Sequence, residues 1–117
     1  MKKRIPCVVL SMLALAGCAN DPAPSEQMRL TISAVEQARA IGADDQIPEM
    51  QLAEAKLARA EKNMGEEDYK RARVFAEQAE LDARLAEAKV LTQKSEAQLA
   101  DLNARITRLR KQLGDVQ

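Results

Sequence analysis

The sequence has no histidine and no tryptophan, and it has only one tyrosine, one phenylalanine and two cysteines among 117 residues. Histidine is the side chain that most often transfers protons near neutral pH and binds transition metals. The four glycines are scattered and form no glycine-rich loop of the kind that holds phosphate groups. We therefore expect the protein not to be an enzyme, and we expect no metal site and no cofactor.

Large core-forming side chains are also scarce. Alanine occupies 21 positions of a chain that is 46% hydrophobic, so a thick globular interior is not expected. The apolar positions are nevertheless periodic and the charges balance, which favours extended helical structure over disorder. Loss of Lys2, Lys3 and Arg4 with a cleaved leader would leave 15 basic and 18 acidic side chains. This mild acidity argues against a nucleic-acid partner.

Residues 1–17 have the pattern of an export signal. Basic residues at positions 2–4 precede an apolar run at residues 5–14 that is too short to span a bilayer. The run ends in Leu15-Ala16-Gly17-Cys18, which resembles the lipobox of bacterial lipoproteins. The resemblance implies cleavage between Gly17 and Cys18, a diacylglyceryl group on the Cys18 thiol and an acyl group on the new amine. An ordinary signal peptide or an uncleaved anchor is the alternative.

Several acyl chains on Cys18 would hold the protein in a membrane permanently, so Cys18 is predicted to be an anchor and not a nucleophile. Cys7 lies inside the predicted leader, which leaves no free thiol in the mature protein. Ala19 stands where aspartate would favour retention in the inner membrane of enteric bacteria. We therefore expect residues 18–24 to be a lipidated tether on the periplasmic face of the outer membrane.

Residues 25–91 are predicted to form an alanine-rich helical domain. Ser25 suits the N-cap of a first helix that ends at Gly42, and Pro48 suits the first turn of a second helix. Gly65 is expected to break the second helix and to let the chain fold back as an antiparallel hairpin. Three-and-four spacing predicts buried faces made of Met28, Leu30, Ile32, Val35, Ala38 and Ile41, then Met50, Ala53, Leu57, Ala60 and Met64, then Tyr69, Ala72, Ala76, Ala79, Ala83, Ala86 and Val90.

Three adjacent carboxylates at residues 66–68 are expected to open the third helix. The helix dipole explains acidic residues in a first turn better than a cation site does, because metal binding needs convergent oxygen ligands. Oppositely charged residues four positions apart predict four ion pairs on exposed helix faces, namely Glu66–Lys70, Glu67–Arg71, Glu80–Arg84 and Asp101–Arg105.

Residues 92–117 are predicted to continue the third helix as an amphipathic extension. Five large apolar residues in heptad spacing form what we call the C-terminal stripe, a candidate interaction site: Leu99, Leu102, Ile106, Leu109 and Leu113. Thr92 and Ser95 interrupt this register on the N-terminal side. In a parallel pair Arg105 would meet Arg110, so a parallel homo-oligomer is disfavoured. Antiparallel pairing, folding back on the same chain and an acidic partner helix all remain open.

The predicted fold class is all-α, with an antiparallel hairpin or three-helix arrangement and a long C-terminal helix that carries a short coiled-coil-like stripe. Residues 64–72 resemble the turn and second helix of one tetratricopeptide repeat, without the repetition of a true array. The lipobox and the segments ARAIGA (38–43), PEMQLAEAKL (48–57) and EQAELDARLA (77–86) resemble envelope lipoproteins with domain of unknown function 4398. This resemblance implies a small helical lipoprotein of Gram-negative bacteria, often encoded near OmpA-like peptidoglycan-binding proteins, without an established activity.

Two functions fit these features. The first is an outer-membrane-anchored, non-catalytic protein-interaction or scaffold module in the cell envelope, for which an OmpA-like protein is one candidate partner. The second is a structural spacer between the outer membrane and peptidoglycan, resembling the major outer-membrane lipoprotein.

Overall fold

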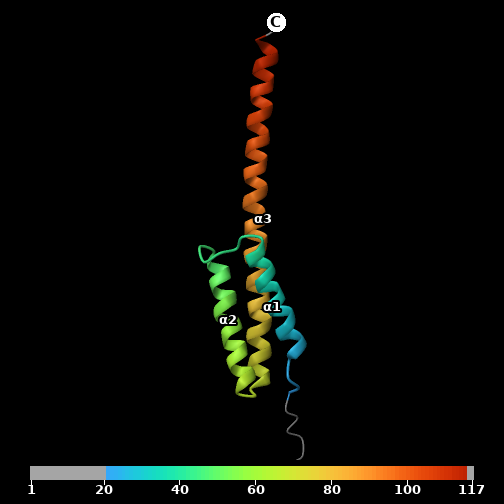
Figure 1. Cartoon of the computed structure of the whole chain (residues 1–117), viewed down its shortest axis with the longest axis vertical. Helices are drawn as coiled ribbons and strands as arrows, with labels where there is room; N and C mark the ends of the chain where they lie inside the picture. Colours follow the sequence, from blue (N-terminus) through green and yellow to red (C-terminus); the bar gives the residue numbers. More distant parts are fainter. Residues whose placement is uncertain (1–20, 116–117) are drawn as a thin grey trace, which may run out of the picture.

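The computed structural model of the chain describes residues 21–115. This part contains three helices and no strands, with α1 at Ser25–Ala40, α2 at Pro48–Gly65 and α3 at Tyr69–Gly114. Helices α1 and α2 lie against the first half of α3, which continues alone beyond them (Figure 1). We call α1, α2 and residues 69–90 of α3 the bundle. The predicted all-α class with a long C-terminal helix is confirmed.

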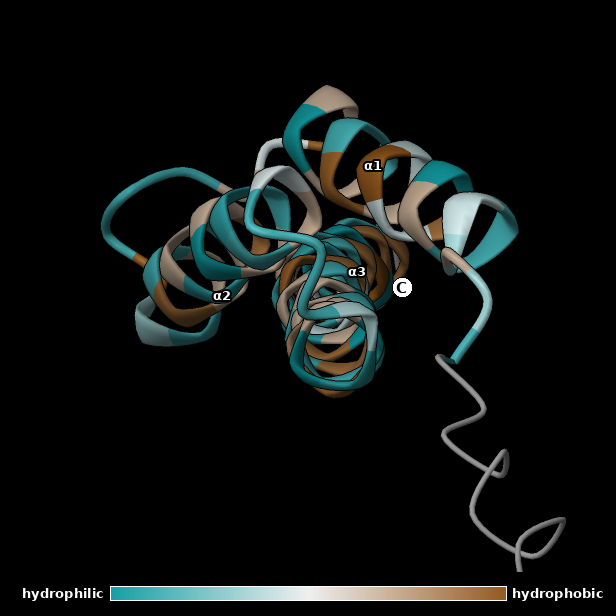
Figure 2. Ribbon diagram, turned by 90° about the horizontal axis from the view of Figure 1, so that it is seen from below, coloured by the Kyte–Doolittle hydropathy of each residue, from teal (hydrophilic) through white to brown (hydrophobic). Residues whose placement is uncertain are grey.

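Helix α3 is the central element, because α1 and α2 pack on adjoining sides of it and leave its remaining side uncovered (Figure 2). The face toward them is nearly all alanine, which lets the helix backbones approach closely. The predicted face of α3 is confirmed, except that Tyr69 is only half-buried; its buried residues are Ala72, Ala76, Ala79, Ala83, Ala86 and Val90.

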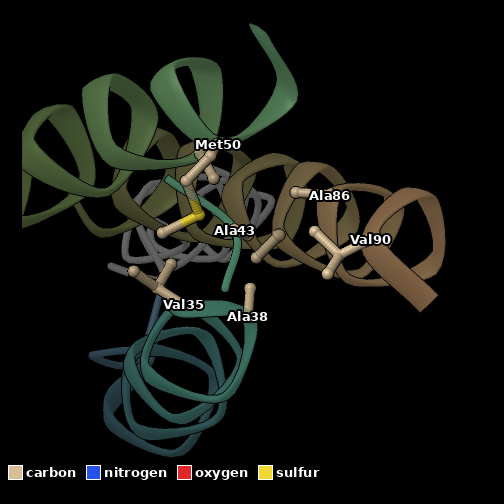
Figure 3. Close-up of a cluster of buried hydrophobic side chains, with 8 residues drawn as sticks. Val35, Ala38, Ala43, Met50, Ala86 and Val90 are labelled. Atoms are coloured by element: carbon tan, nitrogen blue, oxygen red, sulfur yellow. The ribbon is translucent and has the colours of Figure 1, made fainter. Parts of the chain in front are cut away.

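The core consists of two small clusters. In the larger one, Met50 of α2 lies fully buried among residues of all three helices (Figure 3), together with Val35, Ala38, Ala43, Ala53, Ala83, Ala86 and Val90. The smaller cluster contains Met28, Ala60 and Ala76, and the half-buried Phe75 packs against it. The expectation of a thin interior with few large side chains therefore holds for the described residues.

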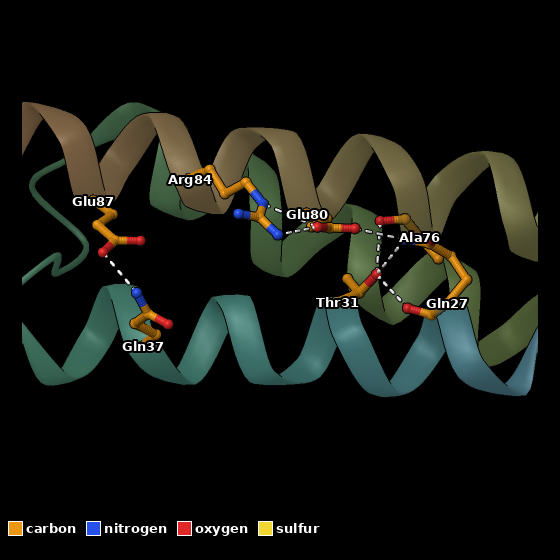
Figure 4. A network of polar contacts seen from close by, with 7 residues as sticks. All are labelled: Gln27, Thr31, Gln37, Ala76, Glu80, Arg84 and Glu87. Carbon is orange, nitrogen blue, oxygen red and sulfur yellow. Dashed lines mark hydrogen bonds and ion pairs between the residues drawn. The ribbon is translucent and has the colours of Figure 1, made fainter.

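The buried face of α1 differs from the predicted one. Leu30 and Ile32 are 43% and 38% exposed, whereas Thr31 is fully buried between Met28 and Val35. The hydroxyl oxygen of Thr31 lies 2.9 Å from the carbonyl oxygen of Ala76 in α3 and 2.9 Å from that of Gln27 in α1 (Figure 4). A polar residue can occupy this core position because its hydroxyl group has acceptors within reach.

The end of α1 is as predicted, but its start is not. Pro24 is the N-cap and Ser25 is the first helical residue, so the prediction of a Ser25 cap is wrong. At the other end Gly42 has a φ of +102°, and the amides of Gly42 and Ala43 donate to the carbonyls of Arg39 and Ala38. These two hydrogen bonds are those of a Schellman motif, which needs a left-handed residue at the Gly42 position.

The turn between α2 and α3 is not made by glycine. Gly65 is the last residue of α2, and Glu67 adopts the left-handed conformation with a φ of +59°. The amides of Glu67 and Asp68 donate to the carbonyls of Met64 and Asn63, which makes a second Schellman motif. Asp68 is the N-cap of α3. The predicted end of the second helix at Gly65 is confirmed, but the left-handed turn residue is Glu67 and not the glycine. Of residues 66–68 only Asp68 takes part in the start of α3, so the prediction for Glu66 and Glu67 is wrong.

Two of the four predicted ion pairs are present, Glu80–Arg84 at 2.5 Å and Asp101–Arg105 at 2.8 Å. The predicted pairs of Glu66 with Lys70 and of Glu67 with Arg71 are wrong, because both glutamates precede α3. Glu66 lies 3.8 Å from Lys62 instead. Other ion pairs join the helices to one another: Arg39–Glu54, Lys56–Asp82 and Lys89–Glu49.

Candidate functional site

The chain beyond the bundle, residues 91–115, consists of the rest of α3 and its C-cap residue and is exposed at every position. We call it the projecting segment. Helix α3 has 46 residues and is therefore about 69 Å long at a rise of 1.5 Å per residue. The projecting segment accounts for about 37 Å of that length. Among the described residues, its only hydrogen bond to a residue outside α3 is that from Lys94 Nζ to the carbonyl oxygen of Ile41, just after α1, at 2.5 Å.

The C-terminal stripe lies on this projecting segment. Its residues are between 45% and 72% exposed, although each is a leucine or isoleucine: Leu99, Leu102, Ile106, Leu109 and Leu113. Single exposed apolar side chains are common on proteins, but five in helical register form a continuous apolar surface. The structure thus places the predicted stripe residues together on one side of a free helix, and their role in binding stays a prediction.

The same register continues along the bundle part of α3, beyond the predicted C-terminal stripe. Steps of four and three residues back from Leu99 lead to Leu85, Leu81 and Val74, which are 48%, 67% and 44% exposed. These positions lie on the side of α3 opposite its buried alanine face. We call them, with the C-terminal stripe, the uncovered face of α3. Extending the heptad count past Thr92 and Ser95 would have revealed it.

A polar network holds α1 to α3 inside the bundle. The carboxylate of Glu80 accepts hydrogen bonds from Gln27 Nε2 at 2.7 Å and from Arg84 Nη2 at 2.5 Å (Figure 4). The Arg84 guanidinium, and then the Gln27 amide, lower the pKa of Glu80, while partial burial opposes this shift. About two helical turns further along α3, Glu87 accepts a hydrogen bond from Gln37 Nε2 at 2.7 Å. These groups satisfy one another, so their role is to position α1.

No group of three or more cysteine, aspartate or glutamate side chains among residues 21–115 could hold a metal ion. No helix in this part is long and apolar enough to cross a membrane. The loop between α1 and α2 borders a shallow polar hollow lined by Arg39, Asp44, Asp45 and Glu54. Gly17 and Cys18, the predicted cleavage and lipidation residues, lie outside the described residues.

The fold therefore defines a small three-helix protein whose third helix projects far beyond its bundle. Residues 26–102 match the model of a domain of unknown function (DUF4398), and the chain belongs to this family. The matched range covers most of the bundle and ends within the C-terminal stripe, at Leu102. This confirms the family that the sequence resembled.

A solved structure supports the assignment. The chain is similar to the crystal structure of a DUF4398 family protein from Pseudomonas aeruginosa PAO1, with 60% sequence identity and a TM-score of 0.80. The alignment covers 82% of this chain and 100% of that chain. Among curated proteins, none matches the chain.

Proposed function

We propose that this DUF4398 protein is a lipid-anchored lipoprotein on the periplasmic face of the outer membrane. In this proposal it acts as a non-catalytic protein-interaction or scaffold module. The uncovered face of α3 is the observation that supports the interaction role, because a contiguous row of exposed large apolar side chains marks a site where a partner binds. The leader pattern and Cys18 support the anchor.

The bundle would hold the C-terminal stripe away from the lipid. The Nη2 atom of Arg73, near the start of α3, lies 3.5 Å from the carbonyl oxygen of Pro22. The chain therefore enters the bundle at the end opposite the projecting segment (Figure 1). An acyl group on Cys18, a few residues earlier, would then attach this entry end to the membrane. The C-terminal stripe would stand in the periplasm, where a partner can reach it.

Cell fractionation tests the anchor. In the full-length chain, Cys18→Ser is expected to move the protein from the membrane to the soluble fraction, because it removes the sulfur that would carry the acyl chains. Cys7→Ser is the matched control and should leave the protein in the membrane fraction. A Cys18→Ser protein that still sediments with membranes would refute the anchor.

In-cell photocrosslinking tests the interaction role. A photoreactive residue at Ile106, in the C-terminal stripe, is expected to give a specific crosslinked protein product. The same residue at Ala104, exposed on the opposite side of α3, is the control and should give much less product. Equal yields at the two positions, or no product at Ile106, would count against a binding surface on this face.

A structural spacer between membrane and peptidoglycan is the second candidate. The observation in its favour is the unbroken α3, whose length of about 69 Å suits a rigid connector. Purified cell-wall sacculi should retain the Cys18→Ser protein if this candidate is correct. They should release it readily if the partner is a protein.

A further inference from the structure

The uncovered face of α3 follows one heptad register, so the residues that flank it can be assigned. With Leu99 at position a, the flanking e and g positions of a helix pair are fixed along all of α3. Asp82, Lys89, Glu96 and Arg110 fall at e positions, and Glu77, Arg84 and Arg105 fall at g positions. The charges at these positions determine the orientation in which two copies of α3 can pair.

A parallel pair of α3 helices gains no attraction between its flanking charges. In a parallel pair each g residue meets the e residue five positions later on the other helix. Three of these contacts join charged residues, and all three join like charges: Glu77 with Asp82, Arg84 with Lys89, and Arg105 with Arg110. Each contact contains at least one residue that is already paired with an opposite charge of its own chain, so the repulsion in a parallel pair is weak; the paired residues are Asp82, Arg84, Lys89 and Arg105.

We propose that the occupant of the C-terminal stripe is a second copy of this chain, paired antiparallel through the projecting segment. In the register that matches the stripes, Leu99 faces Leu109 of the second copy and Leu102 faces Ile106. Each contact occurs twice, which gives four consecutive apolar layers. Ser95 and Leu113 face one another at both ends of this interface. The inference deepens the proposed interaction role and rests on that role alone, because it names the partner. It does not rest on the membrane anchor, since antiparallel pairing sets the two bundles, and with them the two entry ends, at opposite ends of the dimer.

The charges agree with this register. Antiparallel helices bring e residues opposite e residues and g residues opposite g residues. Glu96 then faces Arg110 of the second copy, twice per dimer, and these contacts are attractive. Asn103 faces Asn103 across the two-fold axis. Arg105 faces Arg105, but each Arg105 is already paired with Asp101 on its own helix, with 2.8 Å between Nε and Oδ2.

The free length of α3 also fits. In this register residue 115 of one copy lies opposite residue 93 of the other, so the pairing uses the projecting segment and stops where the bundle begins. Ten partly exposed leucine and isoleucine side chains with their flanking residues would bury on the order of 1,200 Å², which is at the low end for a stable interface. We therefore expect a reversible dimer with a dissociation constant in the micromolar range.

Sedimentation equilibrium of the chain without its leader, carrying Cys18→Ser, measures this association. The solved relative aligns over its whole length to 82% of this chain, so a chain of about that extent folds by itself. The expected result is a monomer–dimer equilibrium up to about 100 µM. A monomer at that concentration, a trimer or a tetramer would overturn the inference.

Arg110→Glu separates the two orientations by the sign of its effect. In the antiparallel register it turns both Glu96–Arg110 contacts into like-charge contacts, and dimerisation should weaken about five- to tenfold. In a parallel pair the same substitution would replace the repulsion at Arg105 with an attraction and strengthen dimerisation. The double change Glu96→Arg with Arg110→Glu should restore the original affinity. Strengthening by Arg110→Glu alone would overturn the inference.

Disulfide trapping tests the register directly. Without Cys7 and Cys18 the chain has no cysteine, so Ser95→Cys and Leu113→Cys can be introduced singly. The proposed register predicts disulfide-linked dimers only when the two variant proteins are mixed and oxidised. Dimers formed by either variant alone would indicate parallel pairing and would overturn the inference.

Ile106→Glu and Ala104→Glu form a matched pair that separates this inference from the proposed function. Both add one carboxylate to the exposed projecting segment, so both proteins should keep the helix content of the parent. Ile106→Glu should abolish dimerisation at about 100 µM, whereas Ala104→Glu should leave it within about twofold. If the purified parent is monomeric while photocrosslinking at Ile106 captures a different protein, self-pairing is refuted and the interaction role stands. If crosslinking yields nothing, the proposed interaction role fails as well.

Discussion

At Glu67 the backbone turns left-handed with a side chain attached, and this conformation costs on the order of 1 kcal/mol relative to glycine. Two residues earlier, Gly65 occupies an ordinary helical position, where an added Cβ would have no atom within 4 Å. The glycine and the left-handed residue therefore stand at different positions in the turn between α2 and α3. Substitutions at Glu67 and Gly65 should therefore raise the free energy of unfolding.

The first prediction concerns this turn. Glu67→Gly should raise the free energy of unfolding by about 0.5–1 kcal/mol, because it relieves the left-handed strain. Gly65→Ala should raise it by a similar amount, because alanine is the better helix former. Urea denaturation followed by circular dichroism measures both. Gly42→Ala is the opposite control and should destabilise, since φ is +102° there. A loss of stability in Glu67→Gly would contradict the assigned turn.

Glu80 gives the second prediction, on pH. Its pKa in the folded protein lies below the ordinary value of 4.5, because Arg84 and Gln27 donate hydrogen bonds to the carboxylate. A lowered folded-state pKa adds stability that is present above pH 4.5 and is lost as pH falls through the folded-state pKa. Glu80→Gln should therefore show a smaller fall in melting temperature than the parent between pH 6 and pH 3.

Glu77→Gln serves as the control for this measurement, because it removes the same charge from an exposed position three residues away. If the melting temperatures of Glu80→Gln and the parent fall in parallel as the pH is lowered, the carboxylate of Glu80 does not stabilise the bundle in the way described.

Among the elements, α3 differs from α1 and α2 in carrying two apolar faces. Its alanine face is buried at essentially zero exposure, while the opposite face carries larger side chains that nothing covers among the described residues. Small residues inside the bundle permit close packing, and large residues outside it are suited to contacts with another helix. Substitutions on the alanine face should therefore change the stability of the bundle, whereas substitutions on the uncovered face should leave it nearly unchanged.

The third prediction tests this separation. Ala79→Glu would place a carboxylate at a fully buried position and should destabilise the bundle by about 3–5 kcal/mol. Ala88→Glu, on the uncovered face of the same helix, should change stability by no more than about 0.5 kcal/mol. Thermal melting by circular dichroism compares the two proteins. Similar melting curves for both would refute the assignment of the two faces.

Local spacing is sufficient to predict most of the element boundaries and the alanine face of α3. It fails for Thr31, whose core position depends on the Ala76 carbonyl 45 residues away, a contact that periodicity cannot reveal. It also fails at Glu67, because the sequence favours glycine for the turn, whereas the last hydrogen bonds of α2 place the left-handed residue two positions later. The uncovered face is predicted only in part, because two polar residues, Thr92 and Ser95, conceal its continuation.

At the scale of the whole molecule, the bundle and the projecting segment share one helix but few contacts. The fourth prediction is that a chain ending after residue 98 keeps the bundle intact, because Lys94 and its hydrogen bond to Ile41 are retained. Its melting temperature in differential scanning calorimetry should lie within about 2 °C of the parent at concentrations where the parent is monomeric. A fall of more than about 5 °C would show that the removed residues stabilise the bundle.

Because α3 is unbroken, any change in the length of the projecting segment also rotates the C-terminal stripe about the helix axis. Deleting the seven residues 92–98 would shorten the projecting segment by about 10 Å and rotate the C-terminal stripe by only about 20°, since seven residues are almost two full turns. Deleting five would shorten it by less, about 7.5 Å, yet swing the stripe to nearly the opposite side. A partner held at a fixed distance from the bundle would lose contact with the C-terminal stripe after either deletion. A mobile partner would still bind after the seven-residue deletion, but not after the five-residue deletion, which turns the stripe away from it.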